Sequence, residues 1–310
     1  MLSYKKVLDW QKGALGVKIS RGDIVIISGA PRCVSNIFLL MKARIKGART
    51  IWWGHLWTAT TKPWRFYLRM VLMKLSHGLL FYTDQEIEEY KLGAGRSDGR
   101  PVSALNNGLD LTEIQQLRKP FDPSERNHRI LFIGRLTEKS KCMQLVEVLA
   151  DPKLSKVKLD IVGDGELKDE MNNRIQSLNL QDRIFLHGGT VDEEEIASIA
   201  NKCAVFAYPG SVGLSLIHAM AYGLPAIVHD DRRQQMPEIA AFKNGVTGLT
   251  FKIDDVSSLA SKILEILAEK ETLKLLSLES AQRADVKYNT EAMAKRFVDM
   301  IERVQKFEEQ

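Results

Sequence analysis

Short runs of apolar residues recur along the chain, and turn residues follow each run. Runs of this length are typical of buried strands, because a buried helix needs more residues. The longer segments between them carry helix-forming residues, so strands alternate with helices. This alternation predicts an α/β protein with parallel sheets covered by helices. The predicted strands are residues 23–28, 50–53, 79–82, 102–105, 128–133, 158–162, 183–186, 204–207 and 226–228.

The helical segments carry recognisable start and stop signals. Thr83 and Asp84 are suited to cap a helix that reaches about Leu92, and the acidic run 192–195 suits the positive end of another helix. The tail 256–307 is nearly all helical and is interrupted at residues 288–289. The other predicted helices are residues 36–46, 62–77, 143–150 and 214–222.

The length of 310 residues suits two domains better than one. We expect an N-terminal α/β domain in residues 1–120 and a C-terminal α/β domain in residues 121–285. The remaining residues, 286–310, are expected to form a helix that packs back on the N-terminal domain.

The stretch from Cys203 to His229 is the most informative part of the chain. A strand leads through residues 209–213 (Pro-Gly-Ser-Val-Gly) into a helix N-terminus, which leaves backbone N–H groups and the positive end of a helix dipole facing outward. Gly210 and Gly213 let an anion approach the backbone closely, and a phosphate is the natural guest. The alternative is a tight turn without a ligand, which is common in α/β proteins.

Basic side chains follow another predicted strand. Arg135 stands just past the strand 128–133, and Lys141 follows six residues later. An arginine and a lysine directed at one point can neutralise the charge that grows on a departing diphosphate. The alternative is a solvated basic loop.

Polar residues also end three strands of the N-terminal part, at residues 28–29, 54–55 and 83–84. Ligands of parallel sheets bind beyond the carboxyl ends of the strands. His55 follows two tryptophans at such an end, so we expect it to face a ligand-binding cleft. The alternative is a histidine that is hydrogen-bonded within its loop.

The composition is that of a soluble globular protein, with 45% hydrophobic and 27% charged residues. The net charge of +5 is too small to indicate nucleic-acid binding, and no nucleic-acid-binding motif supports it. Three widely spaced cysteines show no metal-binding pattern and suit a reducing compartment. Without an apolar leader or a run of about 18 apolar residues, we expect a cytoplasmic protein.

The segment 62–77 is unusual, because its charged side chains are all basic and its aromatic residues leave little polar face. A helix of this kind can dock on an anionic membrane surface, which would place the protein at the inner face of the plasma membrane. The alternative is a helix that packs on the sheet and exposes a few cations.

Several linked motifs resemble those of one family, the retaining family 4 glycosyltransferases of the GT-B fold, of the bacterial polysaccharide-biosynthesis type. The resemblance implies two Rossmann-like domains with parallel sheets that face a cleft. The opening residues 2–19 match the family poorly, so we expect a reduced N-terminal domain. The matching segments are Phe132-Ile-Gly-Arg-Leu136, Val162-Gly-Asp-Gly165, Tyr208-Pro to Gly223-Leu-Pro225, Pro237-Glu238, Thr247-Gly248 and residues 106–110 (Asn-Asn-Gly-Leu-Asp).

The resemblance also implies roles for individual residues. Arg135 matches the arginine that binds the donor phosphates. The family lysine falls at Ser140, so Lys141 or Lys139 has to substitute for it. His55 resembles the histidine near the reacting sugar, and Gly213 begins the helix whose amides bind the donor. The other substrate-binding residues that the resemblance implies are Gly189, Gly210, Ser211, Leu214, His218 and Glu238.

The pattern departs from the family at two glutamates that often stand eight positions apart. Gly210 occupies the first position, which usually binds sugar hydroxyls, and His218 occupies the second, which usually binds the ribose. Gly210 offers no side chain for a hydrogen bond, whereas the imidazole of His218 can still bond a ribose hydroxyl. These departures concern sugar recognition.

The resemblance implies an enzyme that moves a hexose from a nucleoside diphosphate sugar to a glycan or lipid-linked acceptor with retention of configuration. We expect no metal cofactor, because Arg135 and Lys141 can supply the positive charge. A sugar-nucleotide epimerase of the same fold and a truncated, inactive nucleotide-binding protein are alternatives. A dinucleotide oxidoreductase is disfavoured by the absence of a Gly-x-Gly-x-x-Gly fingerprint with its acidic partner.

Overall fold

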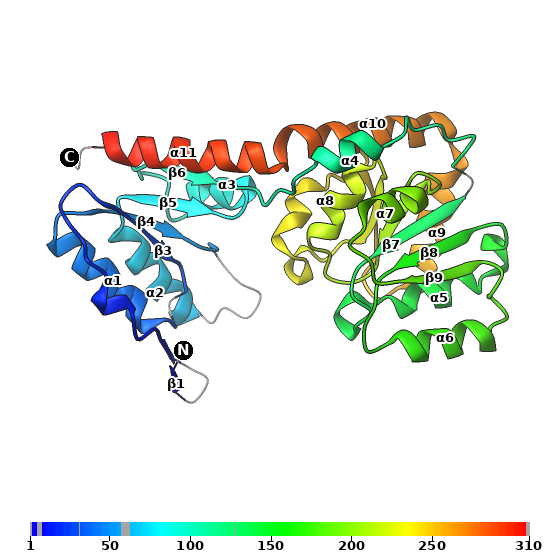
Figure 1. Cartoon of the computed structure of the whole chain (residues 1–310), viewed down its shortest axis with the longest axis horizontal. Helices are drawn as coiled ribbons and strands as arrows, with labels where there is room; N and C mark the ends of the chain where they lie inside the picture. The colour runs from blue at the N-terminus through cyan, green and yellow to red at the C-terminus, as the bar shows by residue number, and fades with distance from the viewer. Residues whose placement is uncertain (1, 5–7, 31, 57–62, 127, 308–310) are drawn as a thin grey trace. The chain divides into compact units, whose positions relative to one another are not determined.

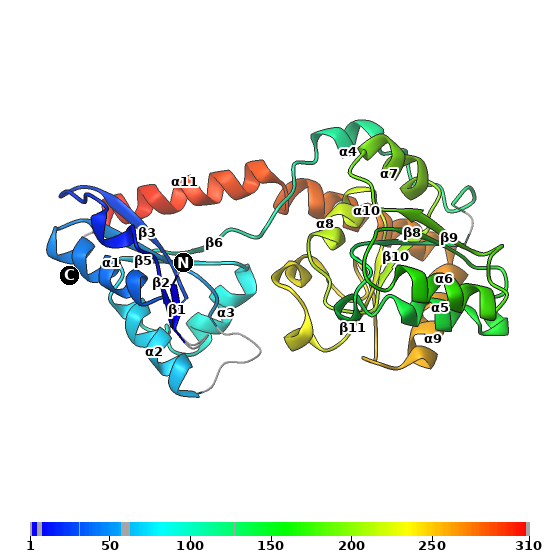
Figure 2. The same ribbon diagram turned by 60° about the horizontal axis from the view of Figure 1, so that its bottom comes forward.

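The computed structural model describes residues 2–4, 8–30, 32–56, 63–126 and 128–307. The chain forms two α/β units (Figures 1 and 2). Unit 1 consists of residues 1–106 and 293–310, and unit 2 consists of residues 107–292. Each unit is built on a parallel sheet, as the alternation of strands and helices predicted.

The sheet of unit 1 has four parallel strands in the order β3-β4-β5-β6. An antiparallel pair, β1 (Leu2–Tyr4) and β2 (Leu8–Trp10), precedes it and was not predicted. The elements are β3 (Ile24–Ser28), α1 (Val34–Ile45), β4 (Arg49–Trp53), α2 (Pro63–Lys74), β5 (Gly78–Phe81), α3 (Asp84–Leu92) and β6 (Val102–Ala104).

The two faces of this sheet are covered by different parts of the chain, since successive side chains of a strand point to opposite faces. Trp52 and Phe81 belong to a core shared with α1, α2 and α3. Ile51 and Leu80 belong to a second core that includes Met300 of α11 (Thr290–Lys306). Figures 1 and 2 show α1 and α2 on one side of the sheet and α11 on the other.

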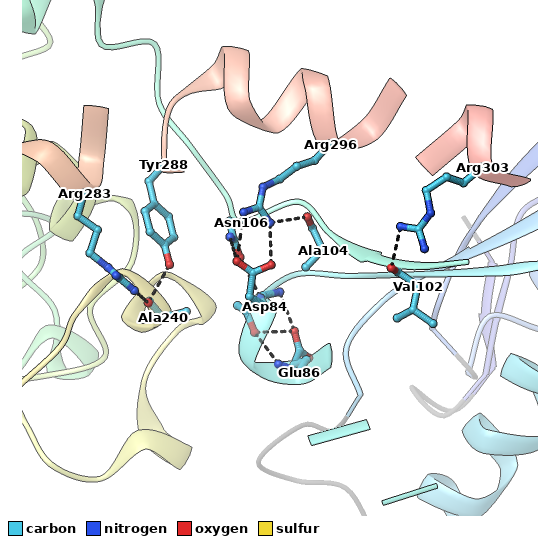
Figure 3. A network of polar contacts seen from close by, with 11 residues as sticks. Asp84, Glu86, Val102, Ala104, Asn106, Ala240, Arg283, Tyr288, Arg296 and Arg303 are labelled. Carbon is cyan, nitrogen blue, oxygen red and sulfur yellow. Dashed lines mark hydrogen bonds and ion pairs between the residues drawn. The ribbon is translucent and has the colours of Figure 1, made fainter. Parts of the chain in front are cut away.

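Polar contacts add to the packing of α11 on unit 1 (Figure 3). The guanidinium of Arg296 donates to Asp84 at 2.7 Å and to the carbonyl of Ala104 at 3.2 Å. Arg303 donates to the carbonyl of Val102 at 3.2 Å. The part of α11 from Met293 onward therefore belongs to unit 1.

The sheet of unit 2 has six parallel strands in the order β12-β11-β10-β7-β8-β9. Its inner strands are buried along most of their length, as expected for a parallel sheet with helices on both faces. The elements are α4 (Thr112–Leu117), β7 (Arg129–Ile133), α5 (Met143–Leu149), β8 (Lys158–Val162), α6 (Lys168–Ser177), β9 (Ile184–Gly188), α7 (Glu193–Ala200), β10 (Val205–Tyr208), α8 (Leu214–Ala221), β11 (Ala226–His229), β12 (Gly248–Phe251), α9 (Val256–Ala268) and α10 (Lys270–Lys287).

The boundaries between the units differ from the predicted positions of 120 and 285. Unit 2 already begins at Asn107, because Ile114 of α4 and its N-cap residue Leu111 lie in its core. It continues to Ala292, because α10 packs beside α8 and Leu109 pairs with Asn289. Strand β12 was not among the predicted strands.

The predicted helix at residues 62–77 corresponds to α2 (Pro63–Lys74). Residue 62 and the side chains of residues 63–65 lie outside the described part of the chain. Met70, Leu72 and Met73 pack into the core of unit 1, whereas Tyr67 and Val71 are exposed. One face of the segment therefore packs on the sheet, as the alternative interpretation of its sequence had it.

Candidate functional site

Two loops at the carboxyl ends of neighbouring strands meet in unit 2. Residues 134–141 follow β7, and residues 209–213 lead from β10 to α8. The amide of Ser211 donates to the carbonyl of Lys139 at 3.2 Å. A Cβ atom on Gly210 would lie only 2.1 Å from the same carbonyl oxygen. Gly210 is therefore required for this close approach, and the glutamate of the related motif has no room on this backbone.

The N-terminus of α8 lies beside these loops. Gly213 is its N-cap residue, and no side chain caps it. Within the described residues, no hydrogen bond occupies the amides of Leu214 or Ser215. The helix therefore presents free N–H groups and the positive end of its dipole, as its sequence predicted.

Glu238 lies against this helix N-terminus and is 7% exposed. Its Oε1 accepts a hydrogen bond of 2.8 Å from the side-chain amide of Asn107. Its Oε2 is buried and has no partner among the described residues. A Cβ atom on Gly213 would lie 3.9 Å from Oε2, which places the free oxygen at the start of α8. A buried carboxylate oxygen without a donor is costly, so a ligand hydroxyl at this point would stabilise it.

Lys139 and Lys141 point to different places. Nζ of Lys141 lies 2.5 Å from Oδ1 of Asp254, and the hydrogen bond from this ammonium lowers the pKa of that carboxyl. Nζ of Lys139 lies 3.2 Å from Sδ of Met236, whose side chain also neighbours the N-cap of α8. The buried Ser140 between them donates its hydroxyl to the carbonyl of Thr137.

Arg135 is exposed at the end of β7, next to Tyr208 at the end of β10. Burial raises the pKa of the Tyr208 hydroxyl, and the charge of Arg135 opposes this rise. The exposed guanidinium of Arg135 adds positive charge near Tyr208, at the end of the strand that leads to α8.

His218 occupies a polar cluster away from the first turn of α8. Its Nε2 lies 2.8 Å from Oε1 of Glu193, which also accepts a hydrogen bond from Tyr222. Burial disfavours the charged form of Glu193, but these two hydrogen bonds outweigh it and lower the pKa of the carboxyl. Only Nδ1 of His218 is then left for a ligand. Glu193 was not predicted as a partner of His218, because in the sequence it is only one member of an acidic run that suits a helix start.

The other predicted site residues of unit 2 lie at strand ends. Gly189 follows β9, and a Cβ atom on it would lie 3.2 Å from Cβ of Asp164, at the end of β8. The hydroxyl of Ser211 donates to the carbonyl of Gln234, so this side chain is used within the protein.

His55 lies in unit 1, just after β4. Its Nδ1 is 3.1 Å from Oε1 of Glu86, and its ring stacks on Tyr82 with 4.1 Å between ring centroids. Glu86 was not predicted as a site residue, although the spacing Thr83-x-x-Glu86 is the signature of a capping box, which the structure contains.

The described residues contain no group of three or more His, Cys, Asp or Glu side chains that is arranged to hold a metal ion. Among the same residues, no helix has both the length and the apolar character needed to cross a membrane.

The chain belongs to the family described as glycosyl transferases group 1, which matches residues 113–283, more than half of its length. This confirms the resemblance seen in the motifs. N-acetyl-alpha-D-glucosaminyl L-malate synthase of Bacillus anthracis is 23% identical over 207 residues, which cover 65% of this chain and 51% of that protein. An N-acetylgalactosaminyltransferase of Campylobacter jejuni that acts on a diphospho-undecaprenol-linked sugar is 30% identical over 183 residues, which cover 58% and 48%.

The fold is also shared with solved glycosyltransferases. The pneumococcal O-GlcNAc transferase GtfA in complex with UDP and GlcNAc has a TM-score of 0.66 and 18% identity, covering 95% of this chain and 59% of that one. The predicted GT-B fold class is thereby confirmed. The chain spans about half the length of such relatives.

Proposed function

We propose that this protein transfers a hexose from a nucleoside diphosphate sugar to a glycan or lipid-linked acceptor with retention of configuration. The observation that carries the proposal is the free oxygen of Glu238 beside the uncapped N-terminus of α8. The carboxylate accepts hydrogen bonds only, whereas the helix amides donate them. A ligand that suits both must offer hydroxyl groups and anionic oxygens a few ångströms apart, as a sugar diphosphate does.

The surrounding charges suit the departure of a nucleoside diphosphate. The amides of Leu214 and Ser215, with Arg135 and Lys139, would stabilise negative charge that grows on the leaving phosphate oxygen. The bond from the anomeric carbon to that oxygen breaks, and a bond to the acceptor hydroxyl forms on the same face of the sugar. The hydroxyl proton passes to the leaving phosphate. No metal ion is required in this proposal.

Glu238 takes over the task of the glutamate that Gly210 replaces. Its Oε1 is held by Asn107, so the orientation of the carboxylate is set before the donor binds. Its Oε2 would accept a hydroxyl of the transferred sugar. We therefore expect the site to reject sugars that lack this hydroxyl, because the buried Oε2 of Glu238 would then stay unpaired.

The proposal is tested by titrating the protein and two variants with UDP and GDP in a calorimeter and by following turnover of UDP-GlcNAc and UDP-glucose. Arg135→Ala is expected to weaken binding of the preferred nucleotide by about tenfold, because it loses a charge-assisted hydrogen bond. Glu238→Gln is expected to leave nucleotide affinity within about twofold and to slow turnover by about tenfold, because the amide NH₂ then faces the sugar hydroxyl.

An exposed carboxylate of unit 2, Glu194, supplies the control, since Glu194→Gln removes the same charge outside the site. Absence of binding to either nucleotide would contradict the proposal and leave the inactive protein as the better interpretation. Nucleotide release that proceeds equally well without acceptor, with an altered free sugar as the product, would favour the epimerase.

We also propose that unit 1 contacts an anionic lipid surface during the proposed sugar transfer. Residues 24–83 contain no Asp or Glu. The charged side chains of this stretch are therefore all basic. Exposed apolar side chains accompany them on α1, at Phe38, Met41 and Ile45, and on α2, at Tyr67 and Val71. Apolar side chains among cations suit the boundary between lipid headgroups and acyl chains. Arg69 of this stretch is buried and does not contribute to the surface. Its other Lys and Arg residues are Arg32, Lys42, Arg44, Lys46, Arg49, Lys62, Arg65 and Lys74.

Co-sedimentation with vesicles checks this proposal. The protein is expected to bind phosphatidylglycerol vesicles and not phosphatidylcholine vesicles, and Ile45→Ser, which alters a side chain that is 80% exposed, is expected to weaken binding several-fold. Val191→Ser, at a 99% exposed position of unit 2, is the matched control and should bind as the unaltered protein does. Equal binding to both kinds of vesicle, or none to either, would contradict the proposal.

A further inference from the structure

Strand β3 forms one edge of the sheet of unit 1, because β4 is its only partner strand among the described residues. The amide of Arg49 donates to the carbonyl of Asp23 at 2.8 Å, and the amide of Gly29 donates to the carbonyl of Trp53 at 2.6 Å. The N–H and C=O groups of successive residues in a strand point to opposite sides. Odd-numbered residues of β3 therefore bond to β4, whereas the backbone groups of even-numbered residues point away from it.

The outward backbone groups of β3 are unpaired. Within the described part of the chain, no hydrogen bond reaches the amides of Ile24, Ile26 and Ser28, or the carbonyls of Ile24 and Ile26. The carbonyl of Ser28 accepts one hydrogen bond of 3.0 Å, from the side-chain amide of Asn36. This bond leaves the second lone pair of that carbonyl free. The whole length of the strand thus presents alternating donors and acceptors to its surroundings.

The opposite edge of the same sheet, strand β6, differs from β3. The carbonyls of Val102 and Ala104, which point away from β5, accept hydrogen bonds of 3.2 Å from Arg303 and Arg296 of α11 (Figure 3). An edge that is covered in this way is kept from pairing with other strands. One edge of the sheet is therefore closed by side chains of this chain, and the edge at β3 is left open.

The sequence of β3 is typical of a strand that pairs on both sides. Residues 24–28 read Ile-Val-Ile-Ile-Ser, with β-branched residues at the first four positions. Exposed edges usually carry a charged residue, a proline or a bulge that discourages further pairing. β3 contains no charged residue and no proline, and its register with β4 has no shift. Nothing within the strand opposes the addition of a further strand.

A second copy of β3 is complementary to this edge. In an antiparallel pair, residues that lie directly opposite each other exchange two hydrogen bonds at every second position. When Ile26 lies opposite Ile26 of a second copy, Ile24 lies opposite Ser28, and every outward amide of each strand meets an outward carbonyl of the other. The paired strands carry no charge, so no like charges come together. The pairing has a two-fold axis, which is the commonest symmetry of protein oligomers.

We propose that unit 1 pairs with unit 1 of a second copy of this chain, antiparallel along β3 and centred on Ile26. The two four-stranded sheets then form one continuous sheet. The two-fold axis of such a pair is perpendicular to the sheet, so the α1 helices of both copies lie on the same face. The exposed apolar residues Phe38, Met41 and Ile45 of both copies then lie on one side of the pair, as simultaneous binding to one lipid surface requires. The inference does not depend on the proposed sugar transfer.

Sedimentation velocity of the full chain tests the association. Over about 1–100 µM protein, we expect a dimer whose share rises with concentration. Hydrogen exchange of the backbone amides then locates the contact. The amides of Ile24, Ile26 and Ser28 should exchange at least about tenfold more slowly in the dimer than in the monomer. The amides of Val25 and Ile27, which bond to β4, should be protected in both states.

Ser28→Pro and Ser28→Ala form a matched pair of variants. The side chain of Ser28 is exposed, and its amide points away from β4. A proline at such an edge position removes an outward donor without removing a hydrogen bond of the sheet. We expect Ser28→Pro to raise the dissociation constant of the dimer by at least about tenfold, because a hydrogen bond is lost on both sides of the two-fold axis. Ser28→Ala keeps the amide and should leave the constant within about twofold.

The unfolding transition of unit 1 in urea, followed by tryptophan fluorescence, shows whether Ser28→Pro still folds. If it does not, the exchange rates in the unaltered protein still decide. A chain that stays monomeric throughout the concentration range would overturn the proposal. So would a dimer in which the amides of Ile24 and Ile26 exchange as fast as in the monomer, or one that a folded Ser28→Pro variant forms equally well.

UDP calorimetry is a separate readout. Absence of nucleotide binding would contradict the proposed function and leave the pairing of β3 standing, whereas a monomer that binds UDP would overturn only the pairing.

Discussion

Gly210→Ala is expected to lower the free energy of unfolding of unit 2 by about 3 kcal/mol and to weaken UDP binding by more than about tenfold. The added Cβ atom would lie 2.1 Å from the carbonyl oxygen of Lys139 and 2.5 Å from the carbonyl carbon of Ser140. Both are backbone atoms, so relief requires the two loops to move apart, and overpacking of this kind costs about 1–3 kcal/mol. The movement would carry Lys139 away from the N-terminus of α8.

Urea unfolding and UDP calorimetry measure the two effects. Gly99→Ala is the control, since a Cβ atom there meets nothing within 4 Å and the residue is exposed. A Gly210 variant as stable as the Gly99 variant, with unaltered UDP affinity, would show that the loops can separate without loss. The expected result would also explain why this chain has glycine where its relatives often have glutamate: the close approach of the loops excludes any side chain.

Met300→Ala is expected to lower the free energy of unfolding of unit 1 by about 2–5 kcal/mol, the usual range for such a truncation in a core. Met300 is completely buried, and its Cε lies in the space that a Cβ atom on Gly78 would occupy. Among the described residues, α11 is the only helix in the core on this face of the small sheet. Loss of its packing therefore exposes the apolar face with Ile51 and Leu80.

Tryptophan fluorescence reports this transition selectively, because all five tryptophans lie before residue 65. We expect the midpoint of the fluorescence transition in urea to fall, while UDP binding at 25 °C is retained by unit 2. Val298 of the same helix is 51% exposed, so Val298→Ala should shift the midpoint by less than the equivalent of about 0.5 kcal/mol. Similar shifts in both variants would contradict the role assigned to this face of α11.

The local features of the chain were predictable from nearby residues. The strand at residues 158–162 has the predicted ends, and Thr83 caps α3 as its position predicted. The loop 209–213 opens a helix whose amides are free. These features follow from apolar run length, capping chemistry and turn residues, all of which act over a few residues.

The partners of the site residues were not predictable in this way. Glu238 and Asn107 are separated by 131 positions, and His218 and Glu193 by 25. Which of Lys139 and Lys141 lies near the N-terminus of α8 was not predictable either. The two lysines are two positions apart, but a left-handed backbone at Lys141 (φ 49°) turns its side chain to Asp254.

The sequence alone therefore determined the α/β class, most strand and helix positions and the family, and it singled out the loops for which donor binding is proposed. The tertiary structure decided which atoms of those loops are left free. Apolar burial and capping depend on neighbours in sequence, whereas the free oxygen of Glu238 and the pairing of His218 with Glu193 depend on side chains that only the folded chain brings within hydrogen-bonding distance.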